Sequence, residues 1–245
     1  MSCAIVVTSG KGGTGKTSLT GGVSSCLAAL GGRVLCIDMD IGLRNLDISL
    51  GMTDRALMDF TDVLENRCPL HRAAVRHPVI ENLSLLTAPL PLPPTVTEKG
   101  MKAFLRAAKE RYDYILMDSP AGLGEGFRLA VCGADRALVV SNTDASALRD
   151  AQRVVSQLSR ELPHIHLVMN RVQPRLLKRL HTTIDEAMDA AGLPLLGVVP
   201  EDEQVLLSAN SGTPIILASR RGAAVAYLNI ARRLMGQKVP LMTLR

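Results

Sequence analysis

The stretch Ser9–Ser18, "SGKGGTGKTS", is the sequence feature that most restricts what this chain can fold into. Its residues Gly10–Thr17 satisfy the pattern G-x-x-x-x-G-K-[ST]. The stretch Cys3–Ser9 before it is rich in apolar and β-branched residues, which predicts a buried strand. The stretch Lys16–Leu30 has the pattern of a helix. A strand, a glycine-rich loop and a helix in this order form a phosphate-binding P-loop, because glycines let backbone N–H groups and the helix N-terminus approach phosphate oxygens.

The motif assigns roles to two side chains of the loop. It predicts that Lys16 reaches the β- and γ-phosphates and that the hydroxyl of Thr17 binds Mg²⁺. Lys11, five positions before Lys16, has no role in the general motif, which tolerates any residue there. The second lysine therefore needs a separate explanation.

The rest of the chain alternates between strand and helix patterns, which predicts a doubly wound, mostly parallel sheet with helices on both faces. Continuous apolar strands fit a sheet that is covered on both sides. Further strands are expected at residues 33–40, 82–88, 112–118, 136–142, 164–170 and 193–200, and further helices at 97–110, 124–132, 145–162, 177–191, 201–210 and 223–235. One P-loop domain over residues 1–235 is expected, with a short tail at 236–245.

Composition excludes several other classes of protein. Of the 245 residues, 47% are hydrophobic and 21% are charged, which is ordinary for a globular domain rather than a disordered chain. No stretch approaches the roughly 18 apolar residues of a membrane span, and no signal pattern precedes the first strand, so we expect a cytoplasmic protein. The five cysteines are odd in number and lack C-x-x-C spacing, which favours reduced thiols. The net charge of +5 is modest and favours a solvated surface.

Acidic and polar residues follow the ends of the predicted strands. Asp38 and Asp40 end the strand 33–40, Asp118 ends the strand 112–118, and Asn170 with Arg171 follows the strand 164–170. Ligands of such sheets bind outside the carboxyl ends of the strands. Asp118 is the expected acid that holds Mg²⁺ directly or through water. One such aspartate alone would more often cap a turn, but three beside a P-loop indicate a nucleotide site.

These residues resemble a known family. Lys11 in "KGGTGKTS" matches the deviant P-loop signature of the ParA/MinD ATPases, and "IDMDIGLRNLDISLG" (37–51), "DSPAG" (118–122) and "VPEDEQVLLSANSGTPI" (199–215) extend the match. The resemblance runs from about Ala4 to Met235. The string "DIGLRNLD" resembles the characteristic sequence of one branch of this family, which helps to place the bacterial division septum.

The resemblance implies an ATP-dependent homodimer with ATP and Mg²⁺ as cofactors. Lys11 would reach across the dimer interface to the partner's nucleotide, and Asp40 would position or activate the attacking water. Asp38, Asp118 and Thr17 would support the metal. The implied ATP-binding residues are Lys11, Gly12, Gly13, Thr14, Gly15, Lys16, Thr17, Ser18, Asn170, Arg171, Pro200 and Asp202. Asn170, with the loop Pro200–Asp202, would recognise adenine.

The resemblance also implies contacts with other proteins and with membranes. Arg44 and Asn45 would lie near the dimer interface, and Asp150 would lie on a helix that receives regulators of the MinC and MinE types. Relatives carry a basic amphipathic C-terminal helix that lies on the membrane surface, whereas "GQKVPLMTLR" (236–245) is interrupted by a proline. A second acid that is common in relatives is replaced by Gln152.

The sequence thus predicts an ATPase that dimerises with ATP and recruits division regulators. The alternatives are a ParA-like DNA-partitioning ATPase and a flagellar-number ATPase of the same family. The basic residues at 171–181 lack interleaved aromatic residues, which make up 2% of the chain, so DNA is an unfavoured partner. A noncatalytic nucleotide-binding module is a further alternative, and phosphate release would distinguish it.

Overall fold

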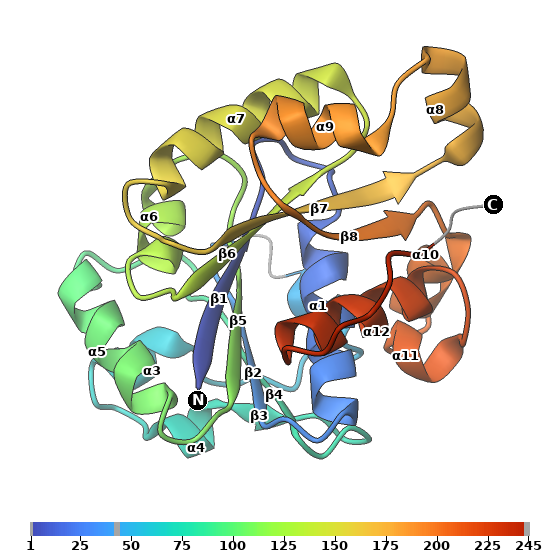
Figure 1. Cartoon of the computed structure of the whole chain (residues 1–245). Helices are drawn as coiled ribbons and strands as arrows, with labels where there is room; N and C mark the ends of the chain where they lie inside the picture. The colour runs from blue at the N-terminus through green and yellow to red at the C-terminus, as the bar shows by residue number, and fades with distance from the viewer. Residues whose placement is uncertain (1, 42–44, 243–245) are drawn as a thin grey trace.

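A computed structural model describes residues 2–41 and 45–242. Eight strands form one sheet in the order β3-β4-β2-β5-β1-β6-β7-β8, and all adjacent pairs are parallel except β3 with β4 (Figure 1). The predicted doubly wound, mostly parallel sheet is confirmed. The strands are β1 (Cys3–Thr8), β2 (Val34–Asp38), β3 (Val75–Arg76), β4 (Leu83–Leu86), β5 (Tyr114–Asp118), β6 (Arg136–Ser141), β7 (Ile165–Val172) and β8 (Leu195–Pro200).

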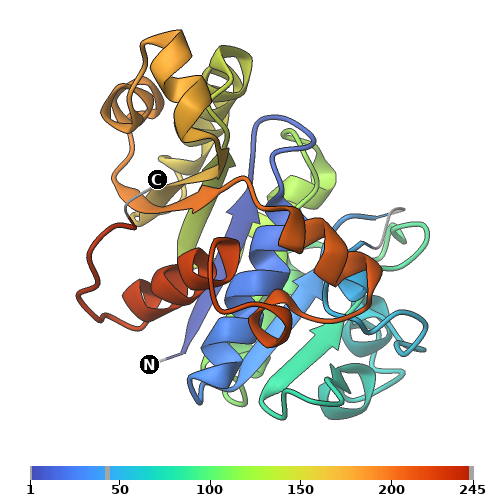
Figure 2. The same ribbon diagram turned by 90° about the vertical axis from the view of Figure 1, so that its right-hand side faces the viewer.

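Helices cover both faces of the sheet and enclose two hydrophobic cores. Successive side chains of β1 alternate between them: Ala4 and Val6 lie in one core, and Ile5 and Val7 lie in the other. The first core is completed by residues of α5 (Glu98–Ala108), α6 (Glu125–Val131), α7 (Ala145–Leu158) and α9 (Ile184–Ala191). The second is completed by residues of α1 (Lys16–Ala29), α11 (Ile215–Ala218) and α12 (Ala223–Leu234). Figure 2 shows α1 and α12 side by side on the second face. Because β1 is a central strand, the loop at its carboxyl end is anchored from both faces.

The helices are α1 (Lys16–Ala29), α2 (Leu46–Ser49), α3 (Phe60–Leu64), α4 (Leu70–Ala73), α5 (Glu98–Ala108), α6 (Glu125–Val131), α7 (Ala145–Leu158), α8 (Pro174–Leu180), α9 (Ile184–Ala191), α10 (Glu203–Asn210), α11 (Ile215–Ala218) and α12 (Ala223–Leu234). Except for the helix expected over residues 177–191, the predicted long helices are present, with ends that differ by a few residues. The short helices α2, α3, α4 and α11 were not predicted, because elements of four or five residues depend on tertiary packing more than on a periodic pattern.

The single helix predicted over residues 177–191 is wrong. The structure has two helices there, α8 and α9, separated at His181, whose φ of 51° is left-handed. Thr183 and Glu186 form a capping box that starts α9 anew. The pattern T-x-x-E was visible in the sequence, but the apolar residues on both sides of it fit one continuous helical period.

Two further findings concern the chain as a whole. All five cysteines are free thiols, and Cys26, Cys36 and Cys68 are buried. Within the described residues, no helix has the length and apolar character that a membrane crossing requires.

Candidate nucleotide site

The loop between β1 and α1 has the geometry of a phosphate cradle. Gly13 and Gly15 have φ values of 78° and 86°, which L side chains rarely adopt. A Cβ on Gly12 or Gly13 would meet open space within 4 Å, whereas one on Gly15 would lie 2.3 Å from Nδ2 of Asn170. The loop is therefore open on the side where a phosphate would bind and closely packed on the other.

Lys16 points into the molecule and is 9% exposed. Its Nζ donates to Oγ of Ser9 at 2.9 Å, and Ser9 Oγ in turn donates to the carbonyl of Lys11 at 2.7 Å. Burial lowers the pKa of Lys16, while the charges of Asp118 and Asp40 oppose this shift. A buried cation that faces two carboxylates is placed to bind phosphate oxygens. The P-loop pattern assigns no role to Ser9, although the position of this residue at the start of the loop could have suggested one.

Thr17 and Asp118 meet at the start of α1. Thr17 Oγ1 donates to Asp118 Oδ2 at 2.6 Å, and Thr20 Oγ1 donates to Asp118 Oδ1 at 3.1 Å. Asp118 is 1% exposed, and burial raises its pKa to about 7. Thr20, which the sequence analysis missed, lies one helical turn after Lys16 and therefore faces the same strand end.

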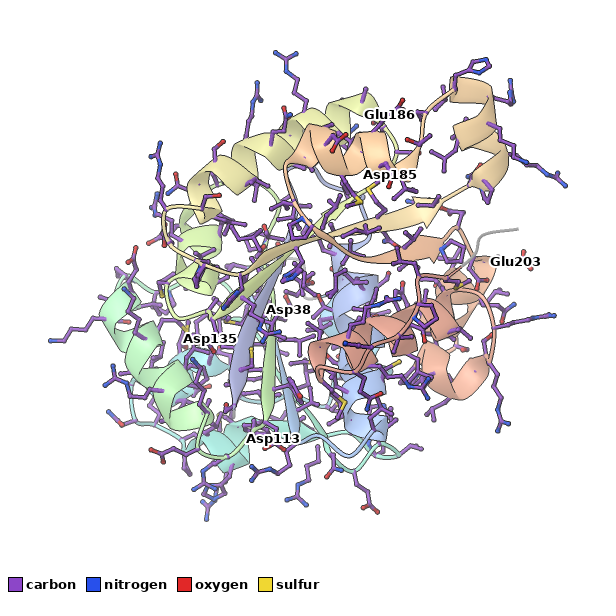
Figure 3. The ribbon with its side chains drawn as sticks, in the orientation of Figure 1. Asp38, Asp113, Asp135, Asp185, Glu186 and Glu203 are labelled. Carbon is purple, nitrogen blue, oxygen red and sulfur yellow. The ribbon has the colours of Figure 1, made fainter. Side chains whose placement is uncertain are left out.

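Asp38 lies beside Asp118, because the two residues are register partners in β2 and β5. Figure 3 shows Asp38 in the interior, away from Asp113, which precedes β5 at the other end of that strand. Asp38 Oδ1 accepts from the N–H of Asp40 at 2.9 Å, and Oδ2 accepts from the N–H of Leu46 at 3.1 Å. Burial raises its pKa to about 6. Asp38 thus anchors the loop that carries Asp40.

Three of the predicted residues follow β2 in the sequence. Asp40 is partly buried, and its charge acts on Lys16 across the site. Asn45 is exposed and begins α2, and its carbonyl accepts from the N–H of Ser49. Arg44 lies outside the described residues.

The residues present fit a hydrated Mg²⁺ ion. Thr17 and Asp118 place a hydroxyl and a carboxylate oxygen 2.6 Å apart beside the cradle, and oxygen donors of this kind are what Mg²⁺ binds. Burial raises the pKa values of Asp38 and Asp118, and the charge of Asp38 adds to the shift at Asp118, so a cation beside these acids would stabilise their charged forms. When bound, Mg²⁺ would neutralise charge that develops on phosphate oxygens.

A cavity of about 440 Å³ adjoins the cradle on the side of β7 and β8. It brings together six of the predicted ATP-binding residues: Gly15, Ser18, Asn170, Arg171, Pro200 and Asp202. Asn170 is 3% exposed, and its Nδ2 donates to the carbonyl of Thr14 at 2.8 Å. The amide nitrogen is thus committed to the P-loop, and Oδ1 is the atom of this side chain that remains for a base.

The side chain of Asp202 has a structural role that the sequence analysis did not foresee. Oδ1 accepts from the N–H of Gln204 at 3.0 Å and caps α10, and Oδ2 accepts from the N–H of Ala223 at 2.8 Å at the start of α12. Gly222, with φ of 58°, leaves the space that this contact needs, since a Cβ there would lie 2.1 Å from Oδ2. The carboxylate is therefore occupied by two helix ends.

Lys11 lies on the outer side of the loop, with 44% of its side chain exposed. Its Nζ donates to Asp144 Oδ2 at 2.8 Å and to Ser146 Oγ at 2.9 Å, at the start of α7. The hydrogen bond from Lys11 lowers the pKa of Asp144 to about 2. The two lysines of the P-loop thus point to different surroundings.

The helix α7 also carries the predicted regulator position. A Cβ on Gly10 would lie 2.2 Å from the main-chain carbon of Asp150, so the P-loop packs directly on α7. The carboxylate of Asp150 faces Arg153 at 3.4 Å. The side-chain amide of Gln152, in α7, donates to the carbonyl of Ala190, in α9, and so links the two helices.

This combination of fold and site defines a P-loop nucleotide-binding protein, and comparison with known proteins gives its family. Residues 5–215 match the model of the CobQ/CobB/MinD/ParA nucleotide-binding domain. The chain belongs to this family. The predicted family is confirmed, and with it the predicted class of ATPase.

The relatives and solved structures narrow the position within the family. The septum site-determining protein MinD of Bacillus subtilis (strain 168) is 41% identical over 98% of this chain and 92% of the relative. The septum site-determining protein MinD of Synechocystis is 38% identical over 99% of this chain and 92% of the relative. A chain of the MinC:MinD cell division protein complex of Aquifex aeolicus is 39% identical, with a TM-score of 0.92 over 99% of both chains. The MinD of Pyrococcus horikoshii, complexed with Mg-ADP, is 29% identical with a TM-score of 0.83 over 96% of both chains.

Proposed function

We propose that this protein is a MinD-type, Mg²⁺-dependent ATPase that dimerises with ATP and takes part in placing the division septum. The observation that carries the proposal is the P-loop with two lysines in different surroundings, Lys16 buried beside the acids and Lys11 at the surface. The likeness to MinD proteins over nearly the whole chain supports it. Residues 1–235 serve as the ATPase domain, and residues 236–245 serve as a short tail.

The chain's own groups account for the chemistry. Lys16 and the N–H groups of the loop Gly12–Ser18 bind the phosphate oxygens, on which charge increases during phosphoryl transfer. Asp40 orients the attacking water and accepts its proton. Thr17 and Asp118 hold the metal, while Asp38 fixes the loop that carries Asp40. Adenine occupies the cavity beside Asn170 and the loop Pro200–Asp202, with Oδ1 of Asn170 and main-chain groups as its polar contacts.

Lys11 supplies a cation to the nucleotide of a second copy of the chain. A charge that completes the site only from a partner subunit makes hydrolysis depend on assembly. ATP therefore acts as the signal for dimerisation. Arg44 and Asn45, which follow Asp40 in the sequence, lie at the dimer interface in this proposal.

A regulator of the MinC type binds the dimer at a surface that includes Asp150, and a MinE-like regulator uses the same helix. The complex described for Aquifex aeolicus MinD supports the MinC-like partner. The DNA-partitioning alternative has weaker support, because the ParA family ATPase of Chlorobium tepidum TLS is 19% identical and shows the fold alone. A flagellar-number role within the family remains the second candidate.

The protein acts in the cytoplasm in this proposal, and residues 236–242 offer little for peripheral contact with the inner face of the cell membrane. Peripheral attachment through an amphipathic helix needs a continuous apolar face and gains about 1 kcal/mol per cation near anionic lipid. Pro240 interrupts the tail, and Arg233 holds it against the domain by donating to the carbonyls of Val239 at 3.1 Å and Pro240 at 2.7 Å. This segment is poorly suited to form a membrane helix.

Asp40→Ala tests the proposed chemistry. Since the phosphate cradle is unchanged in this variant, it should still bind Mg-ATP and should accumulate as a dimer, while phosphate release falls about 100-fold or more, the lower end of what a general base contributes. Phosphate release and molecular mass in ATP and in ADP would be measured for parent and variant. Parental turnover in Asp40→Ala would remove Asp40 from the mechanism, and a parent without Mg-dependent phosphate release would contradict the ATPase proposal.

A further inference from the structure

Residues at the carboxyl end of β7 contact the main-chain carbonyls of the P-loop. Asn170 Nδ2 donates to the carbonyl of Thr14 at 2.8 Å and approaches that of Gly15 at 3.5 Å. Arg171 Nη1 donates to the carbonyl of Gly13 at 3.3 Å. Two consecutive residues of one strand thus contact three consecutive carbonyls of the P-loop.

An irregularity in β7 makes this double contact possible. Consecutive side chains of a regular strand point to opposite faces, so both could not reach one loop. The pairing of β7 with β8 shifts register between Met169 and Val172, and Arg171 has a φ of 56°. Such a conformation is uncommon for residues other than glycine and persists where its surroundings hold it, often at functional sites.

Arg171 also reaches the loop on the other side of the cavity. Its Nε and Nη2 donate to Glu201 Oε2 at 2.9 Å and Oε1 at 3.1 Å, a two-point contact that fixes orientation as well as distance. The N–H of Glu201 donates to the carbonyl of Val172 at 3.0 Å. One guanidinium therefore connects the P-loop to the base loop, defined as Pro200–Asp202.

We infer that Arg171 is a positioning residue that sets the distance between the P-loop and the base loop, acting through Glu201. This inference rests on the proposed ATP site and gives Arg171 a role other than direct contact with the nucleotide. A ligand that carries both a base and phosphates gains from the fixed spacing of the two loops. A ligand with phosphates alone uses the P-loop only and gains nothing.

Calorimetric binding of Mg-ATP and of inorganic Mg-tripolyphosphate would test the inference on the full chain. The variants are Arg171→Gln, Glu201→Gln and the double variant, with Arg175→Gln as a matched control on an exposed arginine of α8. Both partners are partly exposed, at 53% and 37%, so each single variant should lose about 3- to 10-fold in ATP affinity. The double variant should lose no more than the weaker-binding single variant, since the two residues act as one unit.

The tripolyphosphate affinity of the same variants should stay within about twofold of the parent, because single contacts of exposed groups away from the ligand change little. Equal losses for both ligands, additive losses in the double variant, or unchanged ATP affinity in the single variants would each overturn the inference. Thermal unfolding would verify that the variants are folded. A parent that fails to bind Mg-ATP would instead contradict the proposed function, so the two failures are distinguishable.

Discussion

The phosphate end and the base end of the site are built in different ways. At the phosphate end, Lys16, Asp38 and Asp118 are each 9% exposed or less. At the base end, Arg171 and Glu201 keep 53% and 37% of their side chains exposed, and the carboxylate of Asp202 caps two helices. Buried charges interact strongly with a ligand, whereas exposed pairs contribute little each. For the proposed ATP site, this difference predicts that phosphate contacts dominate the affinity for ATP and that the base end adjusts it.

The largest effect is expected at Lys16. Lys16→Ala should weaken Mg-ATP binding by about 100-fold or more, because charge-assisted hydrogen bonds contribute about 1.5–3 kcal/mol each and the other lysine of the loop, Lys11, points away towards Asp144. Equilibrium binding would measure the loss, with Lys178→Ala, on an exposed lysine of α8, as the control. Near-parental affinity in Lys16→Ala would show that the P-loop assignment is wrong.

Asp118→Asn should have opposite effects on the stability and on the activity of the protein. Its pKa rises from 3.8 in the unfolded chain to about 7 in the folded one, so the folded state binds this proton more tightly. Without Mg²⁺ and nucleotide, this group therefore lowers the free energy of unfolding as pH rises from about 4 to about 7. Asp118→Asn should remove that cost and stabilise the metal-free protein by about 1–3 kcal/mol at pH 7.5, while Mg-dependent turnover is lost.

Denaturant unfolding of parent and Asp118→Asn at pH 5 and pH 7.5 would test this prediction. The difference between the two proteins should be larger at pH 7.5. Because the pKa of Asp38 is raised to about 6, the free energy of unfolding of the variant should still fall as pH rises, but less steeply than that of the parent. A variant that is less stable than the parent at pH 7.5 would contradict the prediction.

Asp202 should show a smaller effect, on stability rather than on binding. Asp202→Ala removes two helix-end contacts and should lower the free energy of unfolding by about 1–2 kcal/mol. Asp202→Asn, which keeps a capping oxygen, should lose less. The ATP affinity of the folded variants should stay within about threefold of the parent, as expected for a side chain away from the ligand. A large loss of affinity with parental stability would restore a direct role in ATP binding.

The sequence predicted the phosphate end well and the base end less well, for a physical reason. The P-loop is one continuous segment whose spacing and flanking elements are local, so Lys16, Thr17 and the fold class could be predicted from pattern alone. Strand-end acids such as Asp118 followed from the general geometry of parallel sheets.

The base end depends on contacts between distant segments. The strand irregularity at Arg171, its pairing with Glu201 and the capping by Asp202 join residues that no local pattern relates. The split between α8 and α9 was missed although Thr183 and Glu186 carry the capping signal, because the apolar period continued across it. Ser9 and Thr20 were missed since hydroxyl residues in a P-loop or helix have many possible partners.

Lys11 is the residue on which the proposed ATP-gated dimer depends, and two variants separate its possible roles. In the described chain it pairs with Asp144, so a cis role in holding α7 is the competing explanation. Lys11→Ala removes both the cis pair and any trans contact, whereas Asp144→Asn removes only the cis ion pair and leaves an amide that can still cap α7. If the cis pair were the whole function of Lys11, both variants would behave alike.

Light scattering with Mg²⁺ and a slowly hydrolysed ATP analogue is the most direct test, with the ADP state as reference and phosphate release from ATP measured in parallel. We expect the parent and Asp144→Asn to double in mass and to turn over ATP. Lys11→Ala should remain monomeric and inactive, yet still bind nucleotide through Lys16. A Lys11→Ala protein that dimerises and hydrolyses ATP like the parent would contradict the account.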